Sequence, residues 1–394
     1  MSTHFVARQG QELYFFYHHD KQLKYRVWKD SRLLPEATLH AGAKMPFTVF
    51  HHEGLLHTFC QDTEGDILLF THRQNTWHRR TLMQGDTGVL LTPIVSENGL
   101  CILYNGFSED THCLFKRSMT RSGDWHPTET IDHFSPFSFA PYEAQVTGPG
   151  HLILFYQTQA EECQVGYREI TPKRTGTFHR FLNMQGSLAD ASFLTTQDAI
   201  HILMIVKTTF SCQLLYRKKT EDVFTPPTLL WESPKVDQCL LTMCTGQKPG
   251  HTEGKVSSKG KRTEAAAELH ATCMVGGRLH RAVSGNDGDS FSPMAPYKRK
   301  FCADPVKASY VTPLPQMSQT SSADWFARQV YVDSTAPWDV QMLPDLCPDF
   351  YPKEAVGEST QLRHLHERLA VAQRAMEAKD RQILELMYQS KRDE

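Results

Sequence analysis

Leu152-Ile-Leu-Phe-Tyr156 is an apolar stretch that recurs in altered form along the first three quarters of this chain. Five other repeats open in the same way: Leu13-Tyr-Phe-Phe-Tyr17, Leu55-Leu-His-Thr-Phe59, Leu100-Cys-Ile-Leu-Tyr104, Ile200-His-Ile-Leu-Met204 and Leu269-His-Ala-Thr-Cys273. The first five starts, at residues 13, 55, 100, 152 and 200, are 42 to 52 residues apart. A period of this length built from strands and turns is typical of a β-propeller, in which each repeat forms one four-stranded sheet.

Each repeat carries two further signals after its opening strand. An arginine follows an aromatic or apolar residue some 12 to 18 residues after the start, at Arg26, Arg73, Arg117, Arg168, Arg217 and Arg281. Five repeats then place an aromatic residue in a polar turn, at Trp77, Trp125, Phe178, Phe224 and Phe291. We expect each turn aromatic to fill the gap between two neighbouring sheets. We expect the arginines to face solvent, with a ring of anion or glycan contacts as the alternative.

These repeats predict an all-β propeller of about six four-stranded blades over residues 1–300. The segment before each opening stretch supplies the first strand of its blade. Thr3–Arg8 and Gln329–Asp333 are the candidates to pair and close the ring, because closure removes exposed strand edges.

A resemblance to a known family appears in the sixth repeat. Ser284-Gly-Asn-Asp-Gly288-Asp-Ser-Phe291 resembles the Asp-box of sialidase-like (BNR-type) propellers, in which Ser284, Asn286, Gly288 and Phe291 match the pattern positions. Asn286 stands where the family has aspartate, and Asp287 follows one place late. The box is a folding element in that family, so the resemblance implies fold. No match to the family's Phe/Tyr-Arg-Ile/Val-Pro motif or to its tyrosine–glutamate pair is found, which argues against sialidase activity.

The chain changes character at three places outside the repeats. Residues 245–266 are polar and basic and predict a mobile loop inserted in the sixth repeat. Residues 301–356 are rich in proline and predict an irregular segment with the closing strand near 329–333. Residues 358–391 predict an amphipathic helix.

The predicted helix has a heptad pattern of apolar residues. Its seam comprises Leu362, Leu365, Leu369, Ala372, Met376, Lys379, Ile383 and Leu386. This spacing favours a coiled coil and a homo-oligomer, and packing of the same face on the propeller is the alternative.

Composition restricts the function classes. A formal net charge of −2 gives no overall attraction to nucleic acid. No apolar run is long enough for a transmembrane helix, and no signal peptide opens the sequence, so we expect no membrane insertion and a cytoplasmic protein. The ten cysteines then read as buried thiols, and their spacing predicts no metal site. No nucleotide-binding motif or other cofactor motif occurs.

The function predicted from these features is a noncatalytic binding scaffold with an unidentified protein or glycan ligand. The alternative is a carbohydrate-binding lectin or a glycoside hydrolase, because hydrolysis needs two carboxyl groups on one cleft. Glu143, Asp190 and Asp237 recur at similar positions before first strands and are the candidate catalytic residues. Tyr142, beside Glu143, is the candidate sugar platform, so Tyr142, Glu143 and Asp190 form the predicted ligand-binding set.

Overall fold

The computed structural model describes residues 4–343, apart from these gaps: 11, 30–31, 85–90, 97–98, 109–110, 121–123, 138–139, 141, 149, 159–163, 184–186, 197–198, 222, 246–267, 298–304, 313–323 and 334–340. The chain divides into two compact units, Met1–Leu346 and Cys347–Glu394, and all described residues belong to the first. The predicted helix and all but the first residue of the predicted loop therefore lie outside the described residues.

The described residues form strands and no helix, as predicted for an all-β chain. Strands of the first three repeats are β1 (His4–Gln9), β2 (Glu12–His19), β3 (Gln22–Lys29), β4 (Arg32–Leu33), β5 (Ala37–Ala41), β6 (Ala43–His52), β7 (Leu55–Asp62), β8 (Ile67–Arg73), β9 (Thr76–Met83), β10 (Leu91–Ser96), β11 (Gly99–Ser108), β12 (Thr111–Ser118) and β13 (Glu129–Ser135). Strands of the next three are β14 (Glu143–Gly148), β15 (His151–Thr158), β16 (Gln164–Ile170), β17 (His179–Asn183), β18 (Ser187–Thr195), β19 (Ala199–Lys207), β20 (Cys212–Thr220), β21 (Val223–Phe224), β22 (Thr228–Ser233), β23 (Gln238–Thr245), β24 (Glu268–Val275), β25 (Arg278–Ser284) and β26 (Ala295–Pro296). Four late strands follow: β27 (Val306–Val311), β28 (Asp324–Ala327), β29 (Gln329–Asp333) and β30 (Gln341–Leu343).

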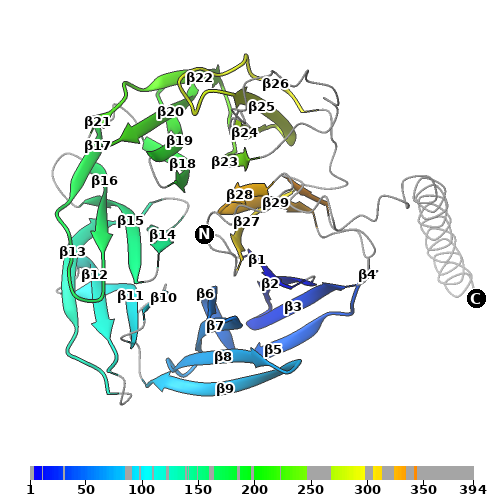
Figure 1. Ribbon diagram of the computed structural model, residues 1–394, viewed down its shortest axis with the longest axis vertical. Coiled ribbons are helices and arrows are strands. Elements are labelled where there is room, and N and C mark those ends of the chain that lie inside the picture. The colour runs from blue at the N-terminus through cyan, green and yellow to red at the C-terminus, as the bar shows by residue number, and fades with distance from the viewer. Residues whose placement is uncertain are drawn as a thin grey trace, which may run out of the picture. The chain divides into compact units, whose positions relative to one another are not determined.

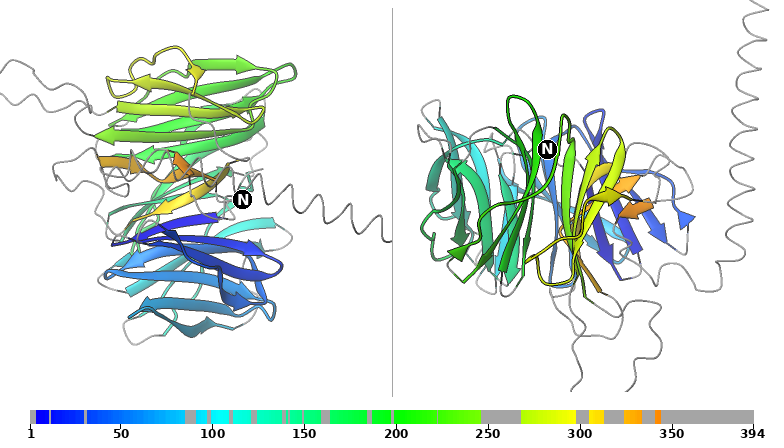
Figure 2. Two further views of the ribbon diagram at one scale, coloured as in Figure 1. Left: turned by 90° about the vertical axis from the view of Figure 1, so that its right-hand side faces the viewer. Right: turned by 90° about the horizontal axis from the view of Figure 1, so that it is seen from above.

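Each repeat folds into an antiparallel meander, and five sheets result within the described part of the chain. The third and fourth repeats join in one sheet because β13 pairs with β15. Figure 1 shows the meanders following one another around the centre of the first unit, with β1, β6, β10, β14, β18 and β23 on their inner side. The side views in Figure 2 show the sheets standing face to face. First strands of successive repeats contact one another, for example β6 with β10 and β18 with β23.

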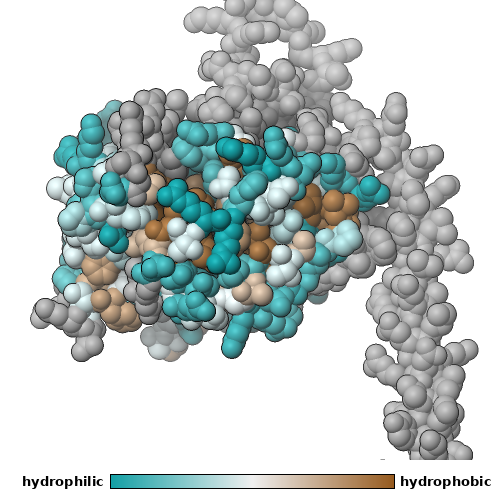
Figure 3. All heavy atoms as spheres, turned by 90° about the horizontal axis from the view of Figure 1, so that it is seen from below, coloured by the Kyte–Doolittle hydropathy of each residue, from teal (hydrophilic) through white to brown (hydrophobic). Residues whose placement is uncertain are grey.

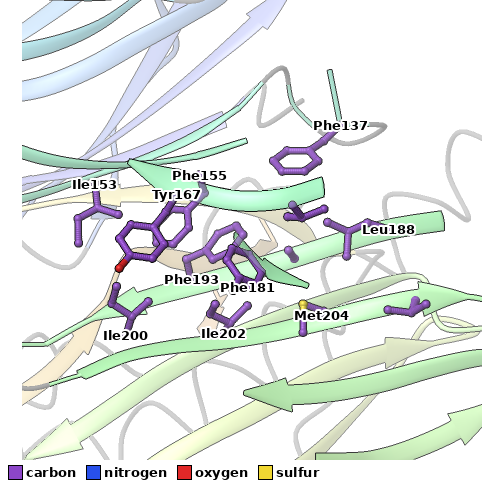
Figure 4. Close-up of a cluster of buried hydrophobic side chains, with 13 residues drawn as sticks. Phe137, Ile153, Phe155, Tyr167, Phe181, Leu188, Phe193, Ile200, Ile202 and Met204 are labelled. Carbon is purple, nitrogen blue, oxygen red and sulfur yellow. The ribbon is translucent and has the colours of Figure 1, made fainter. Parts of the chain in front are cut away.

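The apolar stretches with which the repeats open pack into cores between neighbouring meanders. Figure 4 shows the core between the fourth and fifth repeats, where Phe155 of β15 and Phe193 of β18 stack with ring centroids 4.0 Å apart. Ile202 and Met204 of β19 are also fully buried there. The second strand of each repeat is apolar on both faces because a sheet covers each side of it.

The turn aromatics occupy the predicted gaps between meanders. Trp77 of the second repeat packs on Phe16 of the first, with ring centroids 5.9 Å apart. Phe291 of the sixth packs on Tyr216 of the fifth at 4.7 Å. Trp125 of the third donates from its indole nitrogen to a carbonyl of the second repeat. These contacts confirm, for Trp77, Trp125 and Phe291, the prediction that a turn aromatic fills the gap between two neighbouring sheets.

The repeated arginines hold turns within their own repeat. Three donate to a carbonyl of the following turn and lie over the turn aromatic: Arg117 on His126 O (3.0 Å) and Trp125, Arg168 on Gly176 O (2.8 Å) and Phe178, and Arg217 on Thr225 O (2.6 Å) and Phe224. A guanidinium suits this role because it donates in a plane and stacks on aromatic faces. These three side chains are therefore structural clamps rather than freely solvated groups.

The late strands correct the predicted closure. Gln329–Asp333 is a strand, β29, but it pairs with β27 and β30 instead of with the N-terminal strand. β27 lies between them and pairs in parallel with β1, and β28 pairs with β23. Residues 306–343 thus add strands to the inner edges of the first and sixth repeats, so they belong to the same unit as the repeats.

One side of the first unit is mostly polar. Figure 3 shows the side on which β8 and β9 lie, where hydrophilic residues alternate with smaller apolar areas. Among the described residues no helix could span a membrane.

Candidate functional site

The three predicted carboxylates lie at corresponding ends of inner strands. Glu143 opens β14, Asp190 is the fourth residue of β18, and Asp237 directly precedes β23. Glu143 pairs with Phe155 and Asp190 with Ile205, close to where each second strand turns into the third. We call this side of the unit the hairpin face; it carries the turns at residues 20–21, 63–66, 208–211 and 276–277 that join second to third strands.

The Asp190 carboxylate accepts hydrogen bonds from the late strand β27 and from β23 of the next repeat. Lys307 of β27 donates from Nζ to both carboxylate oxygens at 3.0 Å and to the carbonyl of Ala191 at 2.9 Å. The backbone nitrogen of Cys239 donates to Asp190 Oδ2 at 2.8 Å. The two charged side chains are only 6% (Asp190) and 11% (Lys307) exposed. Burial by itself lowers the pKa of Lys307, but the Asp190 carboxylate outweighs it and keeps that pKa above the ordinary value.

Glu143 is joined to the same cluster through Gln329. Gln329 Nε2 donates to Glu143 Oε1 at 3.4 Å, and Gln329 Oε1 accepts from Ser192 Oγ at 2.9 Å. Ser192 Oγ in turn accepts from the backbone nitrogen of Leu241 at 3.0 Å. Five elements, β14, β18, β23, β27 and β29, therefore meet in one hydrogen-bonded network, which we call the inner polar cluster (Glu143, Asp190, Ser192, Lys307 and Gln329).

The surroundings of Glu143 shift the pKa of its carboxyl group. Burial raises the pKa of Glu143 to about 7; the Lys307 ammonium opposes that shift and the Asp190 charge adds to it. The Glu143 side chain lies at the rim of the cluster. Protein atoms surround it, yet part of its surface is exposed to solvent. A protonatable carboxyl beside a lysine-bound carboxylate is an arrangement found in acid–base sites.

Two predicted site residues do not join the cluster. Asp237 Oδ2 accepts from the backbone nitrogen of Gly276 at 3.0 Å, and its Oδ1 pairs with Lys235 at 3.0 Å, so it fixes a turn. Tyr142 is 2% exposed, and its hydroxyl bonds to Thr92 Oγ1 at 3.0 Å. The prediction of Tyr142 as a sugar platform is wrong, because its ring belongs to the core between the third and fourth repeats.

The turn that resembles an Asp-box has a defined geometry. Ser284 Oγ donates to Asn286 Oδ1 at 2.8 Å and accepts from the Gly288 nitrogen at 2.8 Å. Asn286 Oδ1 also accepts from the Ser290 nitrogen at 3.0 Å, so the asparagine closes the turn in the place of an aspartate. Gly288 has a φ of +87°, and Phe291 packs between repeats as described above.

This turn also covers a buried polar group. His201 is fully buried, its Nδ1 lies 2.8 Å from the Tyr216 hydroxyl, and its Nε2 lies 3.5 Å from Asp287 Oδ1. Burial lowers the pKa of His201 to about 4 although Asp287 opposes the shift. Lys218 neutralises Asp287 at 2.6 Å. Asp287, one place late in the motif, therefore ties the sixth repeat to the fifth.

Sequence reasoning missed two exposed aromatic residues on the hairpin face. Phe210, in the turn between β19 and β20, is 92% exposed, and Phe107, at the end of β11, is 64% exposed. The Phe107 ring packs against the ring of His112, with centroids 4.3 Å apart. The signal was available, since both are phenylalanines placed directly in polar hairpin sequences, Phe107-Ser-Glu-Asp and Thr-Thr-Phe210-Ser.

Within the described residues no three histidine, cysteine, aspartate or glutamate side chains come together as a metal site. The chemistry of the inner polar cluster is that of one ion pair, one carboxyl group with a raised pKa, and neutral hydrogen-bonding groups.

Comparisons with known proteins give distant likenesses. No family model matches the chain, and no curated protein matches it. Similar solved structures include AofleA from Arthrobotrys oligospora (9% identity, 76% of this chain and 87% of that chain, TM-score 0.43) and the fucose-specific lectin from Aleuria aurantia (10%, 75% and 95%, 0.39). The polysaccharide lyase Uly1 is similar over 86% of this chain and 88% of that chain, with 6% identity and a TM-score of 0.49. Likenesses at this level carry no conclusion about what this chain binds or does.

Proposed function

We propose that residues 1–346 form a noncatalytic β-propeller binding module of about six blades that recognises its ligand through the hairpin face. Support for the propeller comes from meanders that follow one another around a centre and contact through their first strands. The Asp-box-like turn fits this fold, because it joins two repeats as a folding element would. A rigid frame of this kind holds loops in fixed positions for binding.

One observation carries the binding proposal. Phe107 and Phe210 are the two aromatic residues among the exposed large hydrophobic side chains of the described part of the chain, and both lie on the hairpin face. An exposed phenylalanine at a rigid hairpin tip costs stability in water and supplies a contact to a ligand. The ligand we propose is a protein or a glycan.

The same face argues against hydrolysis as the main activity. Asp190 is bound by Lys307 and by a backbone amide, and Gln329 bonds to Glu143, so chain elements already occupy the approaches to both carboxyls. A hydrolase needs its pair of carboxyl groups to face substrate.

The binding proposal is tested with matched phenylalanine and valine variants. We expect the double variant Phe107→Ala/Phe210→Ala to lose binding on a glycan array or to partners captured from the native host, at least tenfold, with an unchanged thermal midpoint. Val223→Ala is the control, because Val223 is 69% exposed but lies at the opposite end of β20 from Phe210. Equal binding by the double variant and the wild type would refute a role for this face.

A glycoside hydrolase is the second candidate, favoured by the raised pKa of Glu143 near Asp190, the carboxyl group that Lys307 contacts. It predicts cleavage of aryl-glycoside substrates that Glu143→Gln abolishes and Glu64→Gln, at an exposed turn, leaves intact. Absence of cleavage across a panel of aryl glycosides excludes it.

The remaining proposals concern the environment of the chain. We propose a cytoplasmic location, supported by the buried free thiols of Cys60, Cys101, Cys113 and Cys212, a state which a reducing compartment maintains. We also propose self-association through the seam of the C-terminal segment, which the heptad spacing supports.

A further inference from the structure

We propose that Cys239 and Cys273 are a redox-active pair that closes to a disulfide between β23 and β24. The proposal does not depend on the ligand of the hairpin face. It rests on the register of two strands, on the direction of one backbone amide, and on the burial of both thiols in one core.

The register places the two cysteines directly opposite each other. Cys239 of β23 pairs with Cys273 of β24 in an antiparallel ladder. Residues directly opposite in such a ladder project to the same side of the sheet. Both side chains accordingly lie in the same buried core, and both are fully buried as free thiols.

The amide of Cys239 shows which kind of pair this is. In an antiparallel ladder, opposed residues either exchange two N–H···O bonds or exchange none, and the second kind brings the backbones closer, with Cα atoms about 4.5 Å apart. The Cys239 nitrogen donates to Asp190 of β18, so it points away from β24. The Leu241 nitrogen, two residues on, donates to Ser192 of β18 in the same direction. Cys239 and Cys273 therefore form a pair without mutual hydrogen bonds.

That geometry is compatible with a disulfide. Disulfide-bonded cysteines have Cα atoms roughly 4.4 to 6.8 Å apart, which includes the spacing of this class of pair. Closing the bond needs the two side chains to rotate toward each other without a change of strand register. No other two of the six described free cysteines are paired in register.

The reaction is a two-electron oxidation by a low-molecular-weight disulfide such as oxidised glutathione. One thiolate attacks the glutathione disulfide and releases one glutathione thiol; the second thiolate then attacks the mixed disulfide and releases another. Cys239 and Cys273 lose two protons and two electrons in total, and glutathione disulfide gains them.

Burial sets the conditions under which the bond forms. Burial raises the pKa of Cys273 to about 12 and holds the pKa of Cys239 well above its ordinary value, so both thiols stay protonated in the folded sheet. Because the thiolate is the reacting species, the folded thiols exchange slowly. The bond is expected to form when the strands are open, that is during folding or local unfolding, and to persist once the sheet closes over it.

The test is refolding of the full chain in glutathione buffers of increasing oxidised fraction, followed by acid quench, alkylation, trypsin and mass spectrometry. Trypsin separates the two cysteines at Lys255, Lys259 and Lys261, so a linked peptide pair reports the bond. We expect Cys239–Cys273 to be the dominant intramolecular link, to disappear on reduction, and to be lost in Cys239→Ser and Cys273→Ser. Cys244→Ser is the matched control, because Cys244 shares a strand with Cys239 but faces Glu268 in the ladder.

A second measurement on the wild type removes any dependence on how the serine variants fold. After oxidation and denaturation, Cys239 and Cys273 should both be protected from alkylation and should regain reactivity together on reduction. The proposal is overturned if no such link forms even in pure oxidised glutathione, or if Cys273 links equally well to another cysteine. It is also overturned if protection of one thiol is independent of the other.

Discussion

At the scale of single residues, Glu143 shows how a sequence pattern can find the right group and miss its setting. Its position at the start of an inner strand was predictable from the repeat phase. Its bond to Gln329 was not, because the two residues are 186 positions apart and belong to segments with no shared pattern. A separation of 117 positions likewise hides Lys307 from Asp190. Charge–charge pairing across such separations depends on closure of the whole unit.

The raised pKa of Glu143 predicts a pH-dependent stability. Its pKa rises from 4.5 to about 7 on folding, so the folded protein holds a proton between these values that the unfolded chain has released. The stability linked to this proton is therefore present below about pH 4.5 and is lost as pH rises through 7. We expect Glu143→Gln to be roughly 1 to 3 kcal/mol more stable than the wild type at pH 8 and to lose this advantage at pH 5. Urea unfolding at both pH values, with Glu64→Gln as control, measures it; an advantage that is the same at both would contradict the assignment.

Gly288 predicts a second effect of a single residue. A Cβ atom there would lie 1.9 Å from the hydroxyl of buried Tyr216, and the backbone φ of +87° already disfavours a side chain. We expect Gly288→Ala to cost about 2 to 4 kcal/mol, since ring displacement adds to backbone strain. Gly276→Ala is the control, with φ +54° and no atom within 4 Å of its Cβ, and should cost about 1 kcal/mol. Equal midpoints for the two variants in urea unfolding would show that Tyr216 moves aside freely.

At the scale of elements, the recurring aromatics and arginines could be recognised in the sequence because each contacts residues of its own meander or of an adjacent one. The positions of the turn aromatics were predicted correctly, since a large ring at the same place in each repeat can be buried in few ways other than between neighbouring sheets. Three of the arginines, Arg117, Arg168 and Arg217, were recognised but wrongly expected to face solvent, because each bonds a backbone carbonyl, which leaves no trace in the sequence. Arg168 illustrates this: it bonds Gly176 O, and its guanidinium also meets Asp132 and Tyr156 at 2.7 and 2.6 Å.

Arg168→Lys tests the clamp. A lysine keeps the charge but cannot donate in several directions from one plane, so the turn and the two side-chain partners cannot all be satisfied. We expect a loss of about 1.5 to 3 kcal/mol in the free energy of unfolding. Arg73→Lys, at the exposed equivalent position of the second repeat, should cost less than about 0.5 kcal/mol. A cost for Arg168→Lys as small as that of the control would mean that the clamp contributes nothing.

At the scale of the whole molecule, the all-β class and the repeated meanders followed from the sequence, and the closure did not. The sequence period located the meanders because the second strand of each is strongly apolar. It gave the wrong partner for β29 and none for the other late strands, since four short strands among prolines have no period to read. Those strands decide how the first and sixth repeats end: β27 covers the edge of β1, β28 covers the edge of β23, and Lys307 neutralises Asp190.

Two truncations separate the roles of the late strands and of the C-terminal segment. A chain ending at residue 346 keeps every described contact, and we expect it to unfold cooperatively with the same midpoint as the full chain. A chain ending at residue 305 exposes the edges of β1 and β23 and leaves Asp190 buried without its cation, a loss worth about 3 to 5 kcal/mol for a buried pair, so we expect aggregation or non-cooperative unfolding. Circular dichroism melts measure this difference, and light scattering on the same samples tests the heptad seam.

If Leu362, Leu369 and their seam partners associate, the full chain has a multiple of the monomer mass and the chain ending at 346 does not. Equal subunit numbers would remove the coiled coil, and a well-folded chain ending at 305 would show that the repeats close without the late strands.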